Sequence, residues 1–204
     1  QPDGSIKVFY DSVFGIRGAW NNGDGLGGLA SVGANISNVS IEIIESQVPL
    51  RLLSYGYVPD SGGPGKHRGG LALAREWEIL APEATLTWRS DRRRFPPYGL
   101  MGGKPGKGSL NILNPASENR LLPTKINTIL KEGDVFRHSS PGGGGYGNPL
   151  ERDPQAVWWD WRNGKITTQH GSDVYGVVID EAKKLVDNGA TKKLRKKMNA
   201  VKLP

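Results

Sequence analysis

Short stretches in which apolar and polar residues alternate dominate much of the chain. Residues 39–45 begin with such an alternation and lose it halfway, and residues 49–58 and 70–80 follow with longer runs. Alternation with a period of two is typical of a half-buried β-strand. Residues 85–90 form the next run, and the four residues 81–84 before them have the length of a hairpin connection. We therefore expect strands at these four places, with 70–80 paired to 85–90.

Shorter runs of the same kind continue towards the C-terminal end. Asn163-Gly164 lies between the last two of them, and this dipeptide is a strong signal for a tight β-hairpin. The expected strands are 109–113, 124–130, 135–139, 157–161 and 165–168. About nine strands joined by short turns are typical of a β sandwich or a barrel-like core. The predicted fold is therefore mainly β within the α+β class, with long Gly-rich loops.

The hydrophobic period changes after residue 176, which predicts one or two C-terminal helices. Residues 177–187 place apolar side chains at helical spacing, namely Val178, Ala182, Leu185 and Val186. Asn188-Gly189 is expected to end this helix, and Thr191 to cap a second one. The organisation that we expect is a Gly/Asn-rich loop segment 1–37 lying on a partner or a missing part, a β-rich domain 38–176 and a helical segment 177–204.

Three Gly-rich stretches, 61–70, 99–108 and 139–149, join the strand-like runs. The last contains four consecutive glycines, Gly142–Gly145. Such a run is costly to order because glycine loses more conformational freedom on folding than any other residue. It persists where the backbone needs a positive φ or must lie against another surface. Both interpretations remain open from the sequence.

Composition narrows the possible chemistry. The 204 residues include 29 Gly, 14 Pro and no Cys, so disulfides, zinc–thiolate sites and Cys nucleophiles are excluded for this chain. No apolar run approaches the ~18 residues of a membrane helix, and no signal peptide is recognisable, so we expect a cytoplasmic protein without membrane contact. The formal charge is +7, with much of the excess in the tail 183–197. A solvated or subunit-facing helix, an acidic partner and nucleic acid all remain open, although no nucleic-acid motif accompanies the charge.

The candidate binding residues lie in the Gly-rich stretches. Two kinds of site are open for them: backbone N–H groups and cations that bind an anion, or tight loops that pack against a neighbour. The four-glycine run lacks the phosphate-loop pattern of P-loop proteins. Among Arg92, Arg93 and Arg94, at least one side chain is expected to turn inward to a carboxylate. The candidates for substrate or interface binding are Lys66, His67, Arg68, Arg94, Gly102, Gly103, Lys104, Gly142, Gly143, Gly144, Gly145 and Tyr146.

Catalytic and metal centres are weakly indicated. His138 and Ser139 are neighbours in a predicted strand and therefore point apart, which argues against a Ser–His pair. The stretch 21–28 resembles a calcium loop only superficially, since its acidic residues are too few. His170 and Asp173 have no further ligands at metal spacing. We predict no complete metal site and leave the catalytic residues unassigned.

Three long motifs in a fixed order resemble the hydantoinase B/oxoprolinase family. They are 61–71 (SGGPGKHRGGL), 94–106 (RFPPYGLMGGKPG) and 141–154 (PGGGGYGNPLERDP). Glu42, Glu45, Pro49-Leu50 and the later 175–178 (YGVV) also fit the pattern. The resemblance runs from about residue 20 to the end, and it matches the C-terminal portion of the much longer B-type chains.

The resemblance implies a function that the residues alone do not show. It implies the C-terminal part, or a split subunit, of an ATP-dependent cyclic-amide hydrolase of the hydantoinase, N-methylhydantoinase or 5-oxoprolinase type. An A-type ATPase subunit would activate a carbonyl oxygen by phosphorylation, which makes a poor leaving oxygen a good one. The similar acetone and acetophenone carboxylases and a non-catalytic assembly module remain alternatives.

The resemblance also implies partners. They are the N-terminal portion of the B-type subunit, the A-type ATPase and a small-molecule substrate, with no nucleic acid. ATP and a divalent metal are expected elsewhere in the complex and no cofactor in this chain, because the motifs thought to hold the metal have no counterpart here. The chain is expected to be inactive alone.

Overall fold

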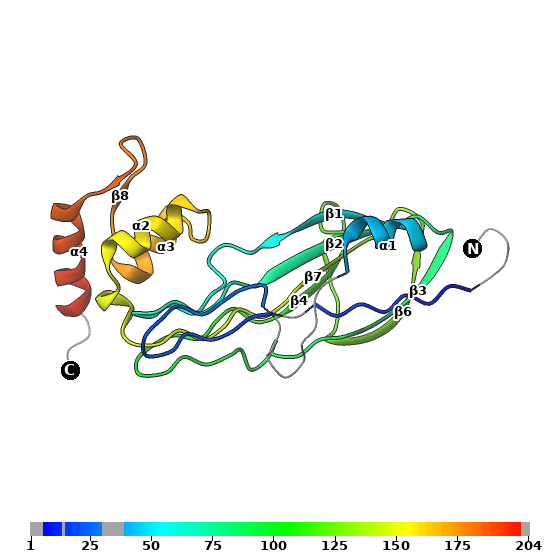
Figure 1. The fold of residues 1–204 in the computed structure, drawn as a ribbon, viewed down its shortest axis with the longest axis horizontal. Helices are drawn as coiled ribbons and strands as arrows, with labels where there is room; N and C mark the ends of the chain where they lie inside the picture. The colour runs from blue at the N-terminus through cyan, green and yellow to red at the C-terminus, as the bar shows by residue number, and fades with distance from the viewer. Residues whose placement is uncertain (1–5, 14, 30–38, 201–204) are drawn as a thin grey trace.

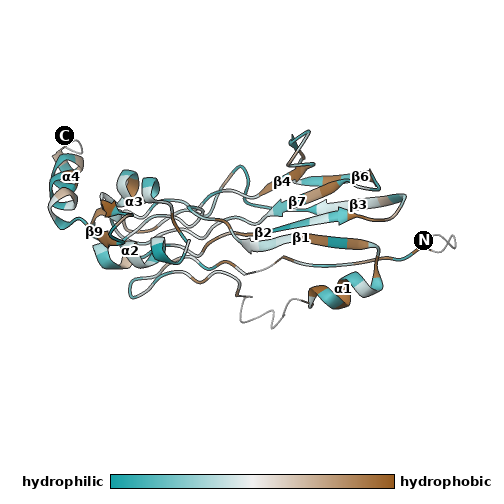
Figure 2. Ribbon diagram, turned by 90° about the horizontal axis from the view of Figure 1, so that it is seen from above, coloured by the Kyte–Doolittle hydropathy of each residue, from teal (hydrophilic) through white to brown (hydrophobic). Residues whose placement is uncertain are grey.

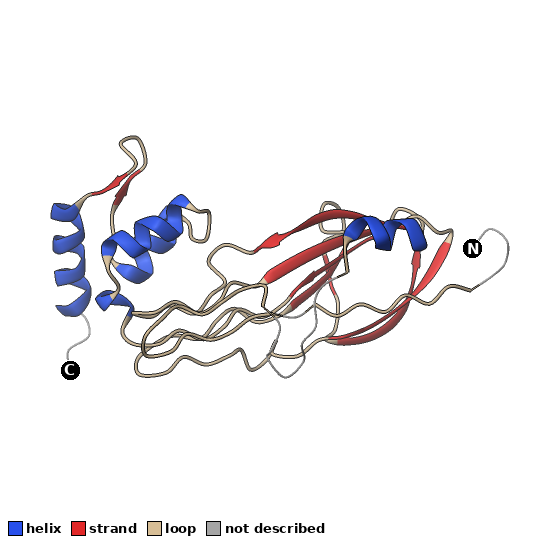
Figure 3. Ribbon diagram, in the orientation of Figure 1, coloured by secondary structure: helices blue, strands red, loops and turns tan. Residues whose placement is uncertain are grey.

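The computed structural model describes residues 6–13, 15–29 and 39–200. The molecule is elongated: two β-sheets lie at one end, several helices at the other, and extended Gly-rich segments connect them (Figures 1 and 3). Of the predicted loop segment 1–37, residues 1–5, 14 and 30–37 lie outside the described residues.

The larger sheet has five antiparallel strands in the order β1-β2-β7-β4-β5. They are β1 (Leu50–Tyr57), β2 (Leu73–Ile79), β7 (Val135–Ser139), β4 (Leu110–Leu113) and β5 (Arg120–Leu121). On one face of β2, Trp77 and Ile79 are buried, whereas Glu78 on the other face forms an ion pair with Arg51 of β1. One face of this sheet therefore carries a core, and the strands predicted at 49–58, 70–80, 109–113 and 135–139 are confirmed.

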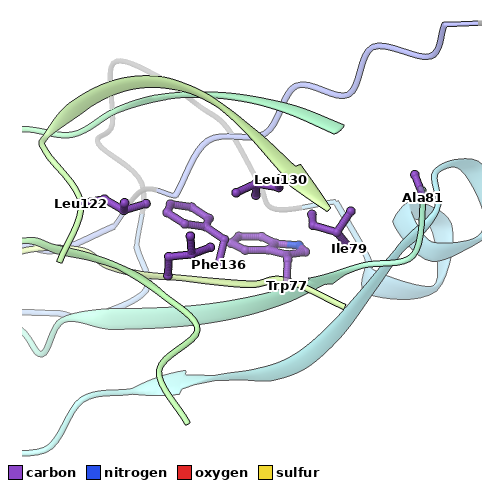
Figure 4. Packing of buried hydrophobic residues seen from close by; sticks show 7 residues of the cluster. Trp77, Ile79, Ala81, Leu122, Leu130 and Phe136 are labelled. Atoms are coloured by element: carbon purple, nitrogen blue, oxygen red, sulfur yellow. The ribbon is translucent and has the colours of Figure 1, made fainter. Parts of the chain in front are cut away.

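A second sheet, β3 (Glu83–Arg89) paired with β6 (Lys125–Lys131), contributes the other side of this core. Figure 4 shows the packed side chains, with Leu130 facing Trp77 and Phe136. Trp88 of β3 meets the Phe136 ring edge-on, with centroids 5.1 Å apart. The mainly β, α+β class and the sandwich are confirmed, but the sheets stay open and form no closed barrel.

The predicted hairpin between residues 70–80 and 85–90 is wrong. β2 has β1 on one edge and β7 on the other, so no edge remains for β3. The chain instead crosses from the larger sheet to the smaller one, where every residue of β3 pairs with β6, from Glu83 with Lys131 to Arg89 with Lys125. The predicted strand 124–130 is confirmed as β6.

The strand predicted at 39–45 is also wrong, because residues Ile41–Gln47 form helix α1. Ile41 and Ile44 are three residues apart, which places them on one face of a helix. They lie against Leu50 and Leu52 of β1, and Ile44 is buried. The loss of alternation at Ile43-Ile44 was the sequence signal for this helix.

Two further predicted strands are wrong. Residues 157–161 lie in helix α2 (Pro154–Arg162). Residues 165–167 lie in the connection that follows α2, and residue 168 begins α3 (Thr168–Tyr175). The start of α2 has an Asp153 cap, whose carboxylate accepts the Gln155 N–H, and proline at the first helical position. Asn163-Gly164 ends α2, with Gly164 at φ 66°, and does not form a β-turn between strands.

The C-terminal part corrects another prediction. Residues Ile179–Asp180 (β8) and Leu185–Val186 (β9) pair as a hairpin where a helix was predicted over 177–187. Asn188-Gly189, expected to end that helix, instead begins α4 (Asn188–Ala200), whose first turn is capped by the Asp187 carboxylate accepting the Ala190 N–H. The helices and the hairpin enclose a second core of Val157, Ile166, Tyr175, Val177, Ile179 and Val186.

The Gly-rich stretches form a bundle of extended segments between the sheets and the helices, which we call the glycine bundle (Figure 2). Its segments are 15–19, 23–29, 61–70, 97–107 and 141–147. The central segment 141–147 donates hydrogen bonds to different neighbours at intervals of three residues: Gly142 and Gly145 to Lys107 O and Lys104 O, and Gly143 and Tyr146 to Gly70 O and His67 O. A period of three is that of the polyproline II helix, which leaves its backbone groups free to bond sideways.

The four consecutive glycines are required by close approach and not by a positive φ. None of Gly142–Gly145 has a positive φ. A Cβ added to Gly142 would lie 1.8 Å from Ser61 O, and one added to Gly144 would lie 1.8 Å from Tyr98 O. Backbones of the bundle therefore touch directly, which decides between the two interpretations that the sequence left open.

Candidate functional site

Four turns lie at the end of the glycine bundle that faces the helices (Figure 1). We call residues 20–23, 66–67, 100–103 and 146–148 the turn cluster. The N–H groups of His67 and Tyr146 each donate to the other residue's carbonyl oxygen at 2.9 Å. Lys66 N–H donates to Gly147 O at 3.2 Å, and Gly147 N–H donates to Leu100 O at 3.0 Å. Backbone bonds thus hold three turns that are far apart in the sequence in one surface.

Six of the candidate residues lie in or beside the turn cluster. Lys66 and Lys104 are exposed cations, whereas His67 and Tyr146 are half-buried between neighbouring turns. The other two are Gly102 and Gly103, which form the turn closed by the bond from Gly103 N–H to Leu100 O. The structure therefore brings together candidates from all three Gly-rich stretches.

The 100–103 turn has an unusual backbone. Met101 has φ 51°, a conformation that bulky L-residues rarely adopt. Its side chain is 75% exposed and that of Leu100 is 52% exposed. A left-handed residue other than glycine costs roughly 1–2 kcal/mol. A strained turn that presents apolar side chains to solvent is a feature often found at binding surfaces.

Gly142–Gly145 lie inside the bundle and are buried. The N–H groups of Gly142, Gly143 and Gly145 donate to backbone carbonyls of neighbouring segments at 2.8, 2.9 and 3.0 Å. These donors are therefore occupied, so the geometry favours packing over the anion-binding loop that the sequence left open. The role of these glycines is to carry the turns.

Arg68 points away from the surface into a buried group of charges, which we call the ion network: Asp24, Arg68, Arg152 and Asp160. Arg68 Nε donates to Asp160 Oδ2 at 3.1 Å. Arg152 holds both oxygens of Asp24 at 2.7 and 2.6 Å, and also donates to Asp160 Oδ2 at 2.7 Å. Arg68, Arg152 and Asp160 are buried, and Asp24 is half-buried. The pairing of opposite charges makes this burial tolerable.

The electrostatics of the ion network agree with this geometry. Burial alone would raise the pKa of Asp24, but the hydrogen bonds and charges of Arg152 and Arg68 hold it below its ordinary value. Burial would likewise lower the pKa of Arg152, whereas the bonds and charges of Asp24 and Asp160 raise it. Asp24 and Arg152 therefore both stay charged near neutral pH.

The ion network joins the turn cluster to the helices. Asp24 follows the 20–23 turn, Arg68 follows the 66–67 turn, and Asp160 lies in α2. Arg152 also donates to Lys66 O at 3.1 Å. Asp24, Arg152 and Asp160 were missing from the candidates predicted from the sequence. The only signal was that Arg152 lies in the third family motif, since ion pairs across 92 and 128 residues leave no local pattern.

Arg94 lies apart from the turn cluster. Its guanidinium is over the Phe95 ring at 5.4 Å, and both side chains are exposed. The arginine of this run that turns inward is Arg93, which donates to the carbonyl oxygens of Ser109 and Leu122 at 3.1 and 2.5 Å. Its partners are carbonyls and not the expected carboxylate.

His138 is buried in the sandwich and not at the surface. Its Nδ1 is 2.8 Å from Asn111 Oδ1, and because Asn111 Nδ2 donates to Pro123 O, we assign Nδ1 as the donor. Burial, together with the charges of Arg93 and Arg75, lowers the pKa of His138 to about 4. The imidazole of His138 is therefore neutral near pH 7 and is bonded to Asn111 within the sandwich.

Within the described residues, no three His, Asp or Glu side chains are grouped so as to hold a metal ion. None of the described helices is long and apolar enough to cross a membrane. Asp24 of the calcium-like stretch forms an ion pair with Arg152.

The basic residues of α4 fall into two groups. Lys192, Lys193, Lys196 and Lys197 are exposed, whereas Arg195 turns inward and donates to Tyr175 O and Arg152 O.

The chain is similar to known proteins over most of its length. It is 36% identical over 199 residues to the B-type subunit of a putative D-/L-hydantoinase of Pseudomonas sp. (strain NS671), covering 96% of this chain and 33% of that protein. The crystal structure of the ATP-dependent caprolactamase from Pseudomonas jessenii matches with a TM-score of 0.76 at 29% identity, covering 91% of this chain and 33% of that one. The nucleotide-free acetone carboxylase matches with a TM-score of 0.75 at 25% identity, covering 93% and 30%.

The chain therefore spans about a third of the length of these relatives. The family model described as hydantoinase B/oxoprolinase matches residues 1–149, which include all the strands of the sandwich and the whole glycine bundle. These matches confirm the resemblance: the chain belongs to the hydantoinase B/oxoprolinase family.

Proposed function

We propose that this chain is the C-terminal portion or a split B-type subunit of an ATP-dependent cyclic-amide hydrolase. The observation that carries the proposal is the 36% identity to the B-type subunit of a hydantoinase across 96% of the chain. A hydantoin, a lactam such as caprolactam, and 5-oxoproline share a ring amide whose opening yields a carboxylate. The substrate class is therefore a cyclic amide.

The chemistry requires parts beyond this chain. The caprolactamase and acetone carboxylase structures are both described as ATP-dependent. We propose that ATP is bound by an A-type ATPase subunit, which phosphorylates the substrate oxygen, and that a divalent metal is held by the other two thirds of the B-type protein. The turn cluster offers contacts but no nucleophile and base pair, which supports the expectation that the chain is inactive alone.

Within this complex we assign the turn cluster to an interface or to the edge of the substrate site. Lys66, His67, Lys104 and Tyr146 supply its polar contacts, and Gly102 and Gly103 shape its turn. Arg68, in the ion network, and Gly142–Gly145, inside the glycine bundle, hold the turns in place without lying on the surface. Arg94 belongs to a separate exposed surface with Phe95. We also propose a cytoplasmic location, with which the absence of Cys in this chain is compatible.

A ketone carboxylase is the second candidate, and the TM-score of 0.75 to acetone carboxylase is the observation that favours it. The two functions differ in their co-substrate. The complex should be purified from the source cells and its chains identified by peptide mapping. It should then be assayed with ATP and a hydantoin, caprolactam or 5-oxoproline, and separately with ATP, bicarbonate and acetone or acetophenone.

Ring opening that depends on ATP supports the hydrolase, and carboxylation that depends on bicarbonate replaces it with the second candidate. A chain that purifies as a lone monomer without an ATPase-like partner would refute both. The variants Lys66→Glu and Lys104→Glu test a third role, that of an assembly module without catalytic chemistry. If they reduce assembly and leave the turnover of assembled complexes unchanged, the turn cluster is an assembly surface without chemistry. Arg68 is unsuitable for this test because its loss would disrupt the buried ion network.

A further inference from the structure

The first described residues form an extended arm whose apolar side faces outward. We call residues 6–10 the arm. Ile6, Val8 and Tyr10 are 90%, 90% and 85% exposed, the highest values among the large apolar side chains of the described residues. In an extended chain, residues at i, i+2 and i+4 share one face. The arm therefore presents a continuous apolar face to solvent.

The opposite side of the arm is held against the protein. Lys7 Nζ donates to Gln47 O at the end of α1, at 3.0 Å. Asp11, the residue after the arm, forms a buried ion pair with Arg75 of β2, and Val13 packs on the sandwich core. Phe9, on the same side of the arm as Lys7, is 36% exposed and is the least exposed apolar side chain of the arm. The arm is thus anchored along its Lys7–Phe9 side, whereas Ile6, Val8 and Tyr10 face solvent.

The backbone of the arm is also open. Within the described part of the chain, no backbone N–H or C=O group of residues 6–10 has a hydrogen-bond partner. An extended segment with free backbone groups and apolar side chains on alternate positions has what strand addition needs: main-chain bonds to a sheet edge, and side chains that enter pockets on one face.

We propose that the arm adds as a strand to a sheet edge in the portion of the family-length protein that this chain does not include. Two observations favour that occupant over others. The arm lies inside the region 1–149 that the family model matches, so it belongs to the architecture that these proteins share. The relatives are about three times as long as this chain, so most of their polypeptide lies outside it. The inference rests on the proposed function only in that the chain works within a longer family protein.

Photo-crosslinking in the assembled protein tests the arm directly. Benzoylphenylalanine is introduced at Val8 in the chain produced in its source cells, and peptides joined to it on irradiation are identified by mass spectrometry. The matched control is Leu121, another exposed apolar residue at 59% exposure. It lies in β5, which forms the edge of the five-stranded sheet opposite to β1. We expect peptides from the remaining two thirds of the hydantoinase B-type polypeptide at position 8 and none at position 121.

Other outcomes overturn the proposal. Crosslinks from position 8 to a second copy of this chain, to a protein unrelated to the family, or to nothing would each show that the arm has another role. A Val8→Glu variant gives a second readout, because a charge buried in the joint should lower the assembled fraction by roughly tenfold or more, while Leu121→Glu leaves it unchanged. If complexes still open cyclic amides with ATP but Val8 neither crosslinks nor affects assembly, the arm inference fails and the proposed function stands.

Discussion

The glycine bundle predicts an unusually large effect for adding one methyl group at Gly144. Gly144→Ala would place a Cβ 1.8 Å from Tyr98 O. A carbon and a carbonyl oxygen approach no closer than about 3.3 Å, so the two segments must separate by about 1.5 Å. Gly145, next in the chain, makes two hydrogen bonds to the segment of Tyr98: its carbonyl accepts from Leu100 N–H at 2.9 Å, and its N–H donates to Lys104 O at 3.0 Å.

Separation of the segments would weaken both of these bonds, at about 1 kcal/mol each, in addition to about 1–3 kcal/mol for overpacking. We therefore expect Gly144→Ala to lower the free energy of unfolding by about 3–5 kcal/mol. For a chain of this size that corresponds to a fall in Tm of at least about 6 °C.

Gly56→Ala is the matched control, measured in the same calorimetric or urea-unfolding series. Gly56 lies in β1, has nothing within 4 Å of an added Cβ and does not require a positive φ. Alanine there should change stability by less than about 1 kcal/mol. Equal Tm values for Gly144→Ala and Gly56→Ala would refute direct backbone contact in the glycine bundle.

Three further changes test other parts of the molecule. Arg152→Ala should cost about 3–5 kcal/mol in urea unfolding, because it leaves Asp24 and Asp160 poorly compensated, and a loss under 1 kcal/mol would contradict the ion network. Because burial lowers the pKa of His138 to about 4, the unfolded state binds more protons between about pH 6.5 and pH 4. Stability should therefore fall by about 3 kcal/mol as the pH drops through that window, and His138→Gln should remove this dependence. Met101→Gly should raise stability by about 1 kcal/mol by relieving the positive φ, and a decrease in Tm would argue against that strain.

The sandwich was largely predictable because its strands are half-buried. β6 shows the reason: its exposed and less exposed residues alternate along Lys125–Lys131, which is the pattern that a period-two search detects. The partner of β3 was not predictable, because a short connection suggests a hairpin unless both edges of the preceding strand are already occupied.

Short apolar runs gave the errors. The run 157–161, with three tryptophans, reads as a strand, yet Asp153-Pro154 begins a helix there. Leu185 and Val186 fit a helix, but Asp187 caps α4 and so places them in β9 before its start. In each case a capping residue, and not the hydrophobic period, determined the element.

The candidate site could be predicted from the sequence only in part. The family motifs located the turns, since Lys66, Gly102 and Tyr146 come from three motifs and lie at one end of the molecule. Their proximity could not be derived from the sequence, because the glycine bundle is joined by backbone bonds that leave no side-chain pattern. Arg68 shows most clearly what the sequence could not predict. It was a candidate cation on a predicted surface turn, yet its side chain is buried against Asp160.

The backbone contacts of the glycine bundle also explain why the ion network lies between the turn cluster and α2. Glycine segments have no side chains to bury, so the bundle gains little from the hydrophobic effect and depends on hydrogen bonds that also exist with water in the unfolded chain. Such a bundle needs its ends fixed by other means. At one end the segments continue into strands around Trp77 and Phe136. At the other end Arg68 and Arg152 tie segments 61–70 and 23–29 to α2, so the ion network does there what a hydrophobic core does at the sheets. The ion network therefore connects the turn cluster to α2, while Lys66, Lys104 and Met101 stay exposed on its outer surface.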